Sequence, residues 1–491
     1  QKFKILKRLV LLVAQLTRQS YVLIWAYCYH ITTRRRPARS DRQGKHNKRH
    51  ISEIATMKQT QKELSCDKEP DSKKQVIVIT GANGCIGRAV LKLLVARDSD
   101  SVSEIRCLDI DIFNQSRNST HIGENENKIQ INWIKGDVRD INIVERTLDG
   151  ATSVIHCASI TDITGLGHDF AFIESVNVDG TLNLLQCCIR QAVESFVYVS
   201  SLEACAGDDA IYYATESTTT MPKTHLFGAS GSTKAKAEQL VRQFASTRLS
   251  KTMPDGRVSS LNAVILRLPP VYGPHDKYFI SQVLAITDSL FGGRLRQLDH
   301  VWIRQQPIFI DNAAWAIICA KQRSLQDLSI SGEEFYVTDD TPICDPFEFI
   351  EPFLKCRNMQ LIRPTYPYIV MWLLLIIYRF LFGLARKVDL FNLIDTKRSS
   401  ASDRHSNKTT TTACLQGEKL ATNRSHSNIQ WLNYVTPTML TFICNTYFFN
   451  RTKASLRLNY SPIVDFNESQ RFAIDWYTNN LDLSQVELKR L

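Results

Sequence analysis

A glycine-rich turn directly after an apolar run limits what this 491-residue chain can fold into. Residues 80–87 read T-G-A-N-G-C-I-G. They follow the strand-length run Val76–Thr80 and precede a stretch in which apolar residues recur at helical spacing. Three glycines spaced three residues apart at a strand-to-helix junction are typical of the turn that cradles a dinucleotide pyrophosphate. We therefore expect a parallel α/β sheet that begins with this strand.

Each position of the turn has an expected task. Gly81 permits the tight turn, Gly84 lets backbone N–H groups approach the pyrophosphate, and Gly87 lets the helix pack close to the sheet. Cys85 and Ile86 would open the helix, whose N-terminus faces the phosphates with its partial positive charge.

Apolar runs of strand length alternate with helical stretches from residue 75 onwards. Runs without period-two alternation fit strands buried on both faces. Strand–helix alternation indicates a parallel sheet with helices on both sides, so we predict an α/β fold with a doubly wound parallel sheet of the Rossmann type. The predicted strands are Val76–Thr80, Ile105–Asp109, Ile131–Ile134, Ser153–Ala158, Phe196–Ser200 and Ala263–Arg267.

An acidic residue marks the end of the second predicted strand. Asp109 follows Gly87 by about 20 residues, the separation expected for a ribose-binding acid. A carboxylate there accepts hydrogen bonds from both ribose hydroxyls and repels a 2′-phosphate. Arg106 precedes Asp109 on the strand, so no arginine of this segment is set to bind such a phosphate. NAD is therefore the expected cofactor, in preference to NADP.

The charge of the chain argues against nucleic-acid binding. The formal net charge is +11, but residues 1–56 hold 13 Lys and Arg against Asp41 and Glu53 and so account for all of it. The remaining chain sums to zero and has no basic footprint.

The cysteines indicate reduced thiols. There are 13 of them, an odd number, with no C-x-x-C pair, and most lie in apolar runs. This suits a reducing compartment. No Cys/His cluster has ligand spacing, so no metal site is expected.

Composition divides the chain into five parts. Residues 1–70 are a basic extension: the apolar residues 9–29, followed by Arg34–Arg36, fit a signal anchor, a targeting peptide, or translated sequence upstream of a start at Met57. The other parts are an NAD-binding domain 75–275, a smaller C-terminal substrate-binding part 276–395 with an apolar helix 366–385, a polar disordered insertion 396–430, and a tail 431–491 that packs on the substrate-binding part.

The apolar helix is short for a membrane span. Its unbroken core, Tyr368–Tyr378, has 11 residues, against ~20 needed to cross a bilayer. A membrane-inserted or interfacial helix is the expectation. The alternative is a helix buried in the protein or capping the substrate cleft.

Three residues form a candidate catalytic group. Ser201 ends the fifth predicted strand, where ligands of doubly wound sheets bind. Ser230 and Lys234 lie four apart in a predicted helix and so share one face.

These motifs together resemble the extended short-chain dehydrogenases, and more closely the 3β-hydroxysteroid dehydrogenase/isomerase branch. The resemblance covers residues 75–395 and 440–481. The carrying segments are Thr80–Gly87, Gly136-Asp137, Asn177–Thr181, Ser200–Glu203, Lys234–Glu238, Arg267, Tyr272-Gly273, Asp311–Ala316 and, above all, Phe335–Pro342.

The resemblance implies roles for the candidate residues. A tyrosine four residues before the lysine is the general base of the family, and the lysine lowers the pKa of that phenol. Lys234 and Ser201 match the lysine and the substrate-binding serine, and Asp137 matches a contact to adenine, although it could equally cap a turn. Ser230 stands in the place of the tyrosine, and its shorter, less acidic hydroxyl is no substitute for a phenolate at neutral pH.

Three explanations for Ser230 stay open. Tyr212 or Tyr213 could supply the phenol, the protein could be a weak or inactive relative that still binds NAD and sterol, or position 230 could carry an error or polymorphism.

The resemblance also implies a function. We expect NAD-dependent oxidation of a 3β-hydroxyl on a steroid or sterol, with a Δ5-to-Δ4 double-bond shift as a further step. The alternatives are a decarboxylating sterol dehydrogenase and a non-catalytic NAD(H)-binding membrane protein. The expected location is a membrane, that of the endoplasmic reticulum or alternatively the mitochondrion, and a homo-oligomer is an open option.

Four further positions receive structural interpretations. His156 lies inside a strand and is expected to be a satisfied core histidine. Arg267 is expected to pair with a buried carboxylate, Asn177 to shape the backbone near the site, and Asp339-Asp340 to form a turn before Pro342.

Overall fold

The computed structural model describes residues 74–97, 101–112, 129–162, 169–250, 259–299, 303–387 and 436–483. All of them belong to one compact unit that begins at Ser72. The predictions for the extension 1–70 and the insertion 396–430 lie outside these ranges.

A seven-stranded sheet forms the centre of this unit, with the strand order β11-β7-β5-β4-β1-β2-β3 and every neighbouring pair parallel. This confirms the predicted doubly wound parallel sheet. Each of the six predicted apolar runs is a strand. The strands are β1 (Gln75–Thr80), β2 (Val102–Asp109), β3 (Gln130–Lys135), β4 (Ser153–His156), β5 (Ser195–Ser201), β7 (Asn262–Leu268) and β11 (Glu334–Tyr336).

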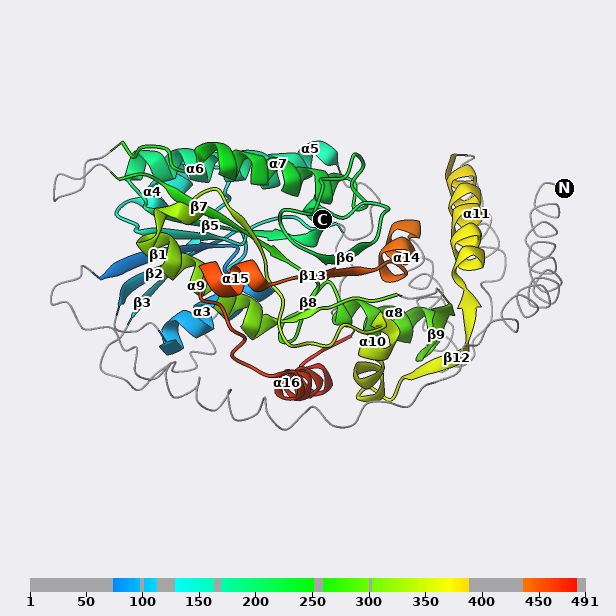
Figure 1. Ribbon diagram of the computed structural model, residues 1–491. Helices are drawn as coiled ribbons and strands as arrows, with labels where there is room; N and C mark the ends of the chain where they lie inside the picture. Colours follow the sequence, from blue (N-terminus) through cyan, green and yellow to red (C-terminus); the bar gives the residue numbers. More distant parts are fainter. Residues whose placement is uncertain are drawn as a thin grey trace, which may run out of the picture. The chain divides into compact units, whose positions relative to one another are not determined.

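Helices cover both faces of the sheet (Figure 1). One face packs on α3 (Cys85–Arg97) and α9 (Ile310–Gln326), and the other on α4 (Ile141–Leu148), α6 (Gly180–Gln191) and α7 (Ala229–Phe244). Successive β1 residues serve the two layers in turn: Ile77 and Ile79 join the first core and Val78 the second. The strands therefore need apolar residues on both faces, which explains their unbroken apolar runs.

Two segments from beyond residue 275 belong to this sheet layer. α9 packs against α3 and β5, and β11 pairs with β7 through Phe335 and Leu266. The predicted substrate-binding part, residues 276–395, therefore includes two segments, α9 and β11, that complete the Rossmann domain.

The remaining elements lie outside the seven-stranded sheet. They include three two-stranded pairings, β8 with β10, β9 with β12 and β6 with β13. Their bounds are α5 (Phe170–Glu174), a π-helical turn (Ser175–Asp179), β6 (Ile211–Ala214), β8 (Val271–Tyr272), α8 (Ile280–Phe291), β9 (Arg294–Asp299), β10 (Ile308–Phe309), α10 (Pro346–Lys355), β12 (Gln360–Pro367), α11 (Tyr368–Lys387), α14 (Pro437–Ile443), β13 (Tyr447–Phe449), α15 (Thr452–Arg457) and α16 (Phe466–Asn479).

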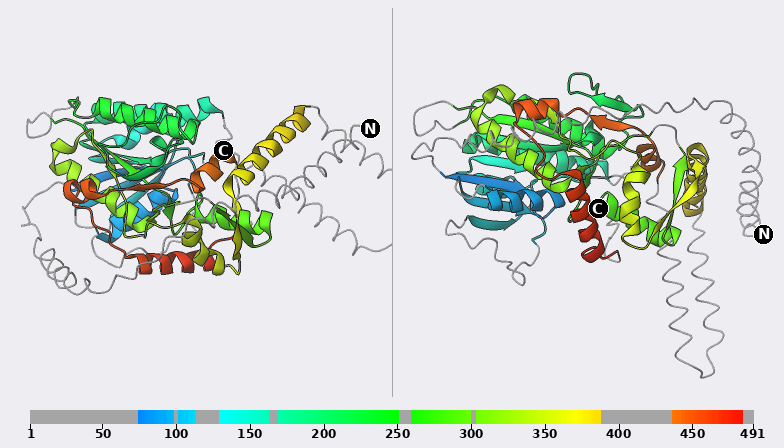
Figure 2. Two further views of the ribbon diagram at one scale, coloured as in Figure 1. Left: turned by 45° about the vertical axis from the view of Figure 1, so that its right-hand side comes forward. Right: turned by 60° about the horizontal axis from the view of Figure 1, so that its bottom comes forward.

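The predicted apolar helix is α11, which lies beside α14 and continues from β12 (Figure 2). Leu375 is buried against α14, whereas Ile369, Leu373, Ile376 and Ile377 are exposed. These four recur at the spacing of one helix face. Within the described ranges, no helix combines the length and the apolar character required to cross a membrane.

Candidate active site

The glycine turn lies at the carboxyl end of β1, next to β4. Gly81 has a left-handed backbone, with φ of +66°, and a Cβ there would lie 2.6 Å from the backbone nitrogen of Ala158. Such a Cβ cannot be accommodated, since the obstacle is backbone. A Cβ on Gly87 would collide with the carbonyl oxygen of Gly81 and with Ala82. Its absence thus lets α3 lie directly against the turn.

The start of α3 can hold a pyrophosphate. The first backbone N–H groups of a helix, here those of Cys85 and Ile86, have no partner within the helix and carry partial positive charge. A Cβ on Gly84 would lie 3.1 Å from the carbonyl oxygen of Gly81, so the turn is tight at this position too. Arg88 donates to the carbonyl oxygen of Asn83 at 3.0 Å and so fixes the turn from the helix side.

Asp109 lies where the adenosine ribose would be held. One carboxylate oxygen accepts from the backbone N–H of Asn83 at 2.9 Å, and the other accepts from Asp111 at 3.1 Å. These bonds orient the carboxylate beside the glycine turn, and each oxygen retains a lone pair for a ribose hydroxyl. The turn, the helix start and this acid therefore fit NAD.

Asp137 lies in the turn between β3 and α4. Its carboxylate forms an ion pair with Arg139 at 2.6 Å and accepts from the backbone N–H of the same residue at 2.9 Å. The Arg139 guanidinium lowers the pKa of Asp137. These contacts are those of a turn residue, and the contact to adenine stays a prediction.

α7 presents Ser230 and Lys234 toward the carboxyl ends of β4 and β5. The Lys234 ammonium is 4% exposed and donates to Ser159 Oγ at 2.9 Å and to the carbonyl oxygen of Val199 at 3.4 Å. Burial lowers the pKa of Lys234, and the charge of Glu203 opposes that effect. The lysine is thus fixed and desolvated within the protein.

Glu203 connects the three predicted catalytic residues. It follows Ser201 on the 3₁₀ turn Leu202–Ala204, and its backbone N–H donates to Ser201 Oγ at 3.3 Å. Ser230 Oγ, which is fully buried, donates to Glu203 Oε2 at 2.5 Å. Burial raises the pKa of Glu203, while Ser230 and Lys234 counteract part of the rise. Ser201, Ser230 and Lys234 therefore surround one buried carboxyl.

Sequence reasoning quoted Glu203 only as part of a family motif and gave it no chemistry. The available signal was an acid two residues after the strand-end serine, at a position that the fold buries. Its hydrogen bond to Ser230 spans 27 residues and has no counterpart in local spacing.

A second buried carboxylate holds α7 to the sheet. Glu238 accepts two bonds from Arg267, at 2.9 and 2.7 Å, and one from Ser200 Oγ at 2.7 Å. Glu238 is fully buried and the Arg267 side chain is 3% exposed. The prediction that Arg267 pairs with a buried carboxylate is confirmed.

Asn177 supports the wall of the site from the π-helical turn. Its side chain exchanges two hydrogen bonds with the backbone of Ile160, at 2.8 and 2.9 Å, and donates to Thr233 at 3.0 Å. It thereby ties the segment after β4 to α7, which confirms its predicted backbone role. π-helical turns are frequent at functional sites.

His156 is satisfied inside the core. Its two ring nitrogens bond to Thr80 at 2.7 Å and to Thr181 at 3.0 Å. Burial lowers the pKa of His156 to about 3, so the ring is neutral. The prediction of a core histidine is confirmed.

The Asp339-Asp340 pair is also structural. Asp339 accepts from the backbone of Phe309 and Thr341 at 2.9 Å, and Asp340 forms an ion pair with Arg451 at 2.7 Å. Both carboxylates are used in turns and packing, as predicted.

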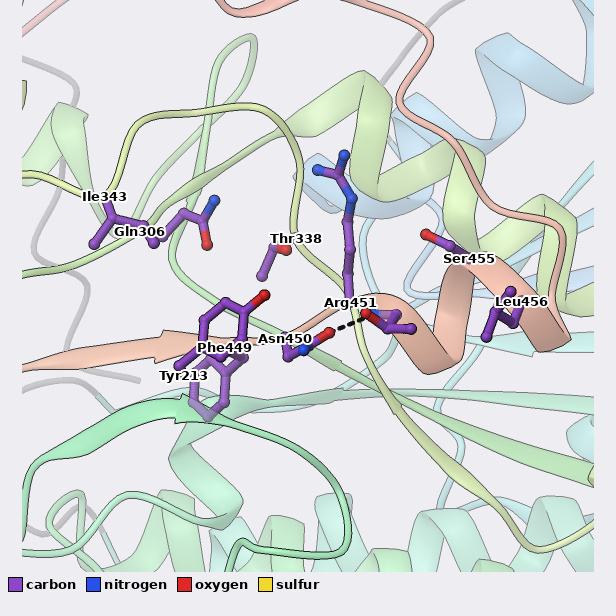
Figure 3. A pocket seen from close by; sticks show the side chains of 10 residues that line it. Tyr213, Gln306, Thr338, Ile343, Phe449, Asn450, Arg451, Ser455 and Leu456 are labelled. Atoms are coloured by element: carbon purple, nitrogen blue, oxygen red, sulfur yellow. Dashed lines mark hydrogen bonds between the residues drawn. The ribbon is translucent and has the colours of Figure 1, made fainter. Parts of the chain in front are cut away.

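The two candidate phenols lie on β6. Tyr212 and Tyr213 are 66% and 62% exposed, and both rings contact Phe448 of β13. Tyr213 lines a cavity of about 380 Å³ together with Gln306 and with tail residues such as Phe449 (Figure 3). That cavity takes none of its lining from the glycine turn, β5 or α7. Among the described contacts, nothing brings either phenol to Lys234.

A third phenol was missed by sequence reasoning. Tyr278 lies in the segment between β8 and α8, and burial raises its pKa, followed by the charges of Cys85 and Glu203. Its side chain is nevertheless 40% exposed. Asp276 holds the segment by accepting from Tyr278 and Phe279 at 2.8 and 2.9 Å.

The parallel sheet, the glycine turn, the ribose acid and the Ser–Lys pair define an oxidoreductase fold of the extended short-chain dehydrogenase class. The sequence profile of the 3-beta hydroxysteroid dehydrogenase/isomerase family matches residues 78–366, and the chain belongs to that family. Mouse (Mus musculus) 3 beta-hydroxysteroid dehydrogenase type 7 is 26% identical over 317 residues, which cover 62% of this chain and 78% of the mouse protein.

Solved structures share the fold at low sequence identity. UDP-glucose 4-epimerase from Thermotoga maritima is 16% identical, with 83% of this chain and 100% of the epimerase covered and a TM-score of 0.51. The dTDP-glucose 4,6-dehydratase DesIV from Streptomyces venezuelae, a double mutant solved with NAD bound, is 17% identical, with 82% and 97% covered and a TM-score of 0.52. MoeE5, another similar structure, was also solved with NAD bound.

Proposed function

We propose that this chain is an NAD-dependent oxidoreductase that oxidises the 3β-hydroxyl of a steroid or sterol. The observation that carries the proposal is the group formed by the half-buried Ser201 and the buried Glu203, Ser230 and Lys234 at the carboxyl end of β5. Hydroxyl, carboxyl and ammonium groups meet where doubly wound sheets bind ligands. Family membership supports the 3β-hydroxysteroid as substrate class.

The residues divide the work of alcohol oxidation. NAD, when bound along the glycine turn, supplies the acceptor for a hydride. Asp109 holds the ribose hydroxyls and disfavours a 2′-phosphate. Ser201 Oγ can hydrogen-bond the substrate oxygen, and the Lys234 ammonium stabilises negative charge that develops there. Burial of these groups strengthens each electrostatic interaction because water is excluded.

An apolar substrate is consistent with an enzyme at a membrane. The exposed apolar face of α11 (Ile369, Leu373, Ile376 and Ile377) supports interfacial binding, since such a face gains free energy when it enters the lipid boundary. Steroids partition into the same layer. We therefore include membrane association in the proposal. The organelle and a homo-oligomeric state remain sequence-based predictions.

The test is production of NADH by the purified full chain given NAD and a Δ5-3β-hydroxysteroid. We expect turnover with NAD, little with NADP, and tight binding of NADH. A parallel reaction with a carboxylated sterol separates the decarboxylating alternative, because carbon dioxide would then be released. Absence of turnover with every sterol, despite NADH binding, would contradict the proposed activity.

The second candidate function is a non-catalytic NAD(H)-binding protein, which the serine at position 230 favours. The variant Ser230→Tyr distinguishes this function from that of an enzyme. A phenol beside Lys234 restores the family's general base, so we expect kcat to rise by about 100-fold or more, the usual value of a positioned base. Ser232→Tyr, two positions along α7, is the matched control and should give no gain. No gain from Ser230→Tyr either, together with tight NADH binding, would favour the binding protein.

A further inference from the structure

We propose that Glu203 accepts the proton of the substrate hydroxyl, through Ser230 Oγ, in place of the family's phenol. This inference rests on the proposed function and identifies the base that the sequence lacks. It concerns a residue to which sequence reasoning gave no chemistry.

The geometry provides a hydrogen-bonded connection to Glu203. Ser230 occupies the turn of α7 that precedes Lys234, and its hydroxyl donates to Glu203 Oε2 at 2.5 Å. A hydroxyl that donates to a carboxylate still has lone pairs to accept a proton from another hydroxyl. Ser230 can therefore pass a proton to Glu203 without ever holding a negative charge, which removes the objection that serine is a poor base.

The carboxyl is held among groups from several elements. Ser230 and Lys234 approach from α7, and Ser201 from the end of β5. Asp162, in the segment after β4, raises the pKa of Glu203 by its charge, and Glu203 in turn raises that of Tyr278 before α8.

Two further titratable groups lie close by. Burial, followed by the charges of Glu238 and Glu203, raises the pKa of the Tyr198 phenol, and burial lowers the pKa of His225. Lys234 is the cation that faces Glu203 in this set.

Burial suits the carboxyl to this task. Only 7% of Glu203 is exposed, and burial raises its pKa from the ordinary 4.5. A general base works best when its pKa lies closer to the working pH, and raised carboxyl pKa values are a known way to reach that condition. The hydrogen bond from Ser230 and the charge of Lys234 oppose part of this rise.

The step balances in atoms and charge. The substrate O–H bond breaks and its proton goes to Ser230 Oγ, while the Ser230 proton goes to Glu203 Oε2. The carbinol C–H bond breaks, and its electron pair leaves with the hydride to NAD. The carbon–oxygen bond becomes a ketone, and Glu203 afterwards releases its proton to solvent.

The tyrosine phenols are weaker candidates for the general base because of where they lie. Tyr212 and Tyr213 are largely exposed on β6 and contact Phe448. Burial, followed by the charges of Cys85 and Glu203, raises the pKa of Tyr278, so Tyr278→Phe belongs in the test as the competing base.

The experiment measures kcat, KM and NADH affinity for Glu203→Gln in two backgrounds, the natural chain and Ser230→Tyr. We expect Glu203→Gln to lower kcat by about 100-fold or more in the natural chain, with NADH affinity retained as evidence of an intact fold. In the Ser230→Tyr background the loss should be small, because the phenol then takes the proton. The limb of the pH profile on which kcat rises with pH should disappear in Glu203→Gln alone.

Glu216→Gln is the matched control. Glu216 is a partly buried glutamate that accepts one hydrogen bond, from the backbone of Tyr336 at 2.7 Å, and glutamine retains that acceptor. We expect its activity and pH profile to be unchanged.

The remaining outcomes are distinct. Three results would overturn this inference while the proposed function stands, provided that the natural chain turns over. The kcat of Glu203→Gln could equal that of the natural chain, or Glu203→Gln could lower kcat by the same factor in both backgrounds. Tyr278→Phe, rather than Glu203→Gln, could also abolish the rise of kcat with pH. Turnover only after Ser230→Tyr overturns the inference as well, since Glu203 alone does not then suffice. No turnover in either background overturns the proposed function and the inference with it.

Discussion

Gly81 and Gly150 share a left-handed backbone but differ in their surroundings. Their φ angles are +66° and +69°, yet a Cβ on Gly81 would meet Ala158 whereas one on Gly150 would meet nothing within 4 Å. An L-residue in this region costs about 1–2 kcal/mol. We therefore expect Gly150→Ala to lower the free energy of unfolding by about that amount. Gly81→Ala should lower it further and abolish NADH binding.

Urea unfolding and NADH fluorescence would measure the two glycine variants. Both variants bear the cost of the left-handed backbone angle. The additional loss of unfolding free energy in Gly81→Ala therefore measures the cost of the close approach between the turn after β1 and the segment after β4. Equal destabilisation with NADH binding retained in both would show that the approach is not essential.

At the scale of elements, the Glu238–Arg267 pair joins α7 to β7. Removal of one partner leaves the other charged and buried, which costs about 3–5 kcal/mol. We expect Glu238→Gln to destabilise the protein by that amount. Glu351→Gln, which alters an exposed pair with Lys355, should change stability by less than about 1 kcal/mol. Denaturant unfolding of both variants measures the contrast, and similar losses would contradict it.

The same pair predicts a pH dependence. Burial raises the pKa of Glu238, but the hydrogen bonds and charge of Arg267 outweigh burial, so the net pKa lies below the ordinary 4.5. As pH falls below 4.5, the unfolded chain takes up the proton first. The stabilisation is thus present above that pH and is lost as pH falls through the folded pKa. Glu238→Gln should flatten this part of the stability curve.

α11 carries the prediction of membrane association. Leu373 lies in the middle of its exposed apolar face, and burial of a leucine in lipid is favourable by about 1.5–3 kcal/mol. Leu373→Glu should therefore weaken binding to phospholipid vesicles by about tenfold or more. Leu456→Glu is the control, because Leu456 is 78% exposed on α15, away from α11. Co-sedimentation would measure both, and equal effects would contradict an interfacial α11.

At the scale of the whole molecule, the tail binds the segment that precedes α8. The Tyr477 hydroxyl of α16 donates to Asp276 at 3.1 Å and accepts from the backbone N–H of Gly273 at 2.9 Å. Tyr477→Phe leaves both buried groups short of a partner, which costs about 1–3 kcal/mol. We expect lower thermal stability and weaker NADH binding. Tyr212→Phe, whose ring is exposed, should have little effect on either; a similar loss there would contradict the role of Tyr477.

The sheet could be predicted from the sequence because its signal is local. Six of the seven strands contain an apolar run, and the glycine turn fixes which strand comes first. The pairings of β6 with β13 and of β9 with β12 could not be predicted, since they join segments far apart in the chain. β11 was missed as a strand because only three residues, Glu334–Tyr336, pair with β7.

The candidate site was predictable only in part, for the same reason. Gly81, Asp109, Ser201 and Lys234 stand at fixed places relative to strand ends and helix starts. The partner of Ser230 is set by how α7 packs on the turn after β5, and that packing is a property of the fold.

The bond between Tyr477 and Asp276 bears on how the protein is made. The phosphate-binding turn leaves the ribosome early, whereas the hydroxyl that secures the segment near it belongs to α16, which is translated after every strand of the sheet. A nascent chain can thus complete its nucleotide cradle well before the covering segment is fastened. A chain that ended ahead of α16 would therefore leave Asp276 and the Gly273 N–H without the Tyr477 hydroxyl.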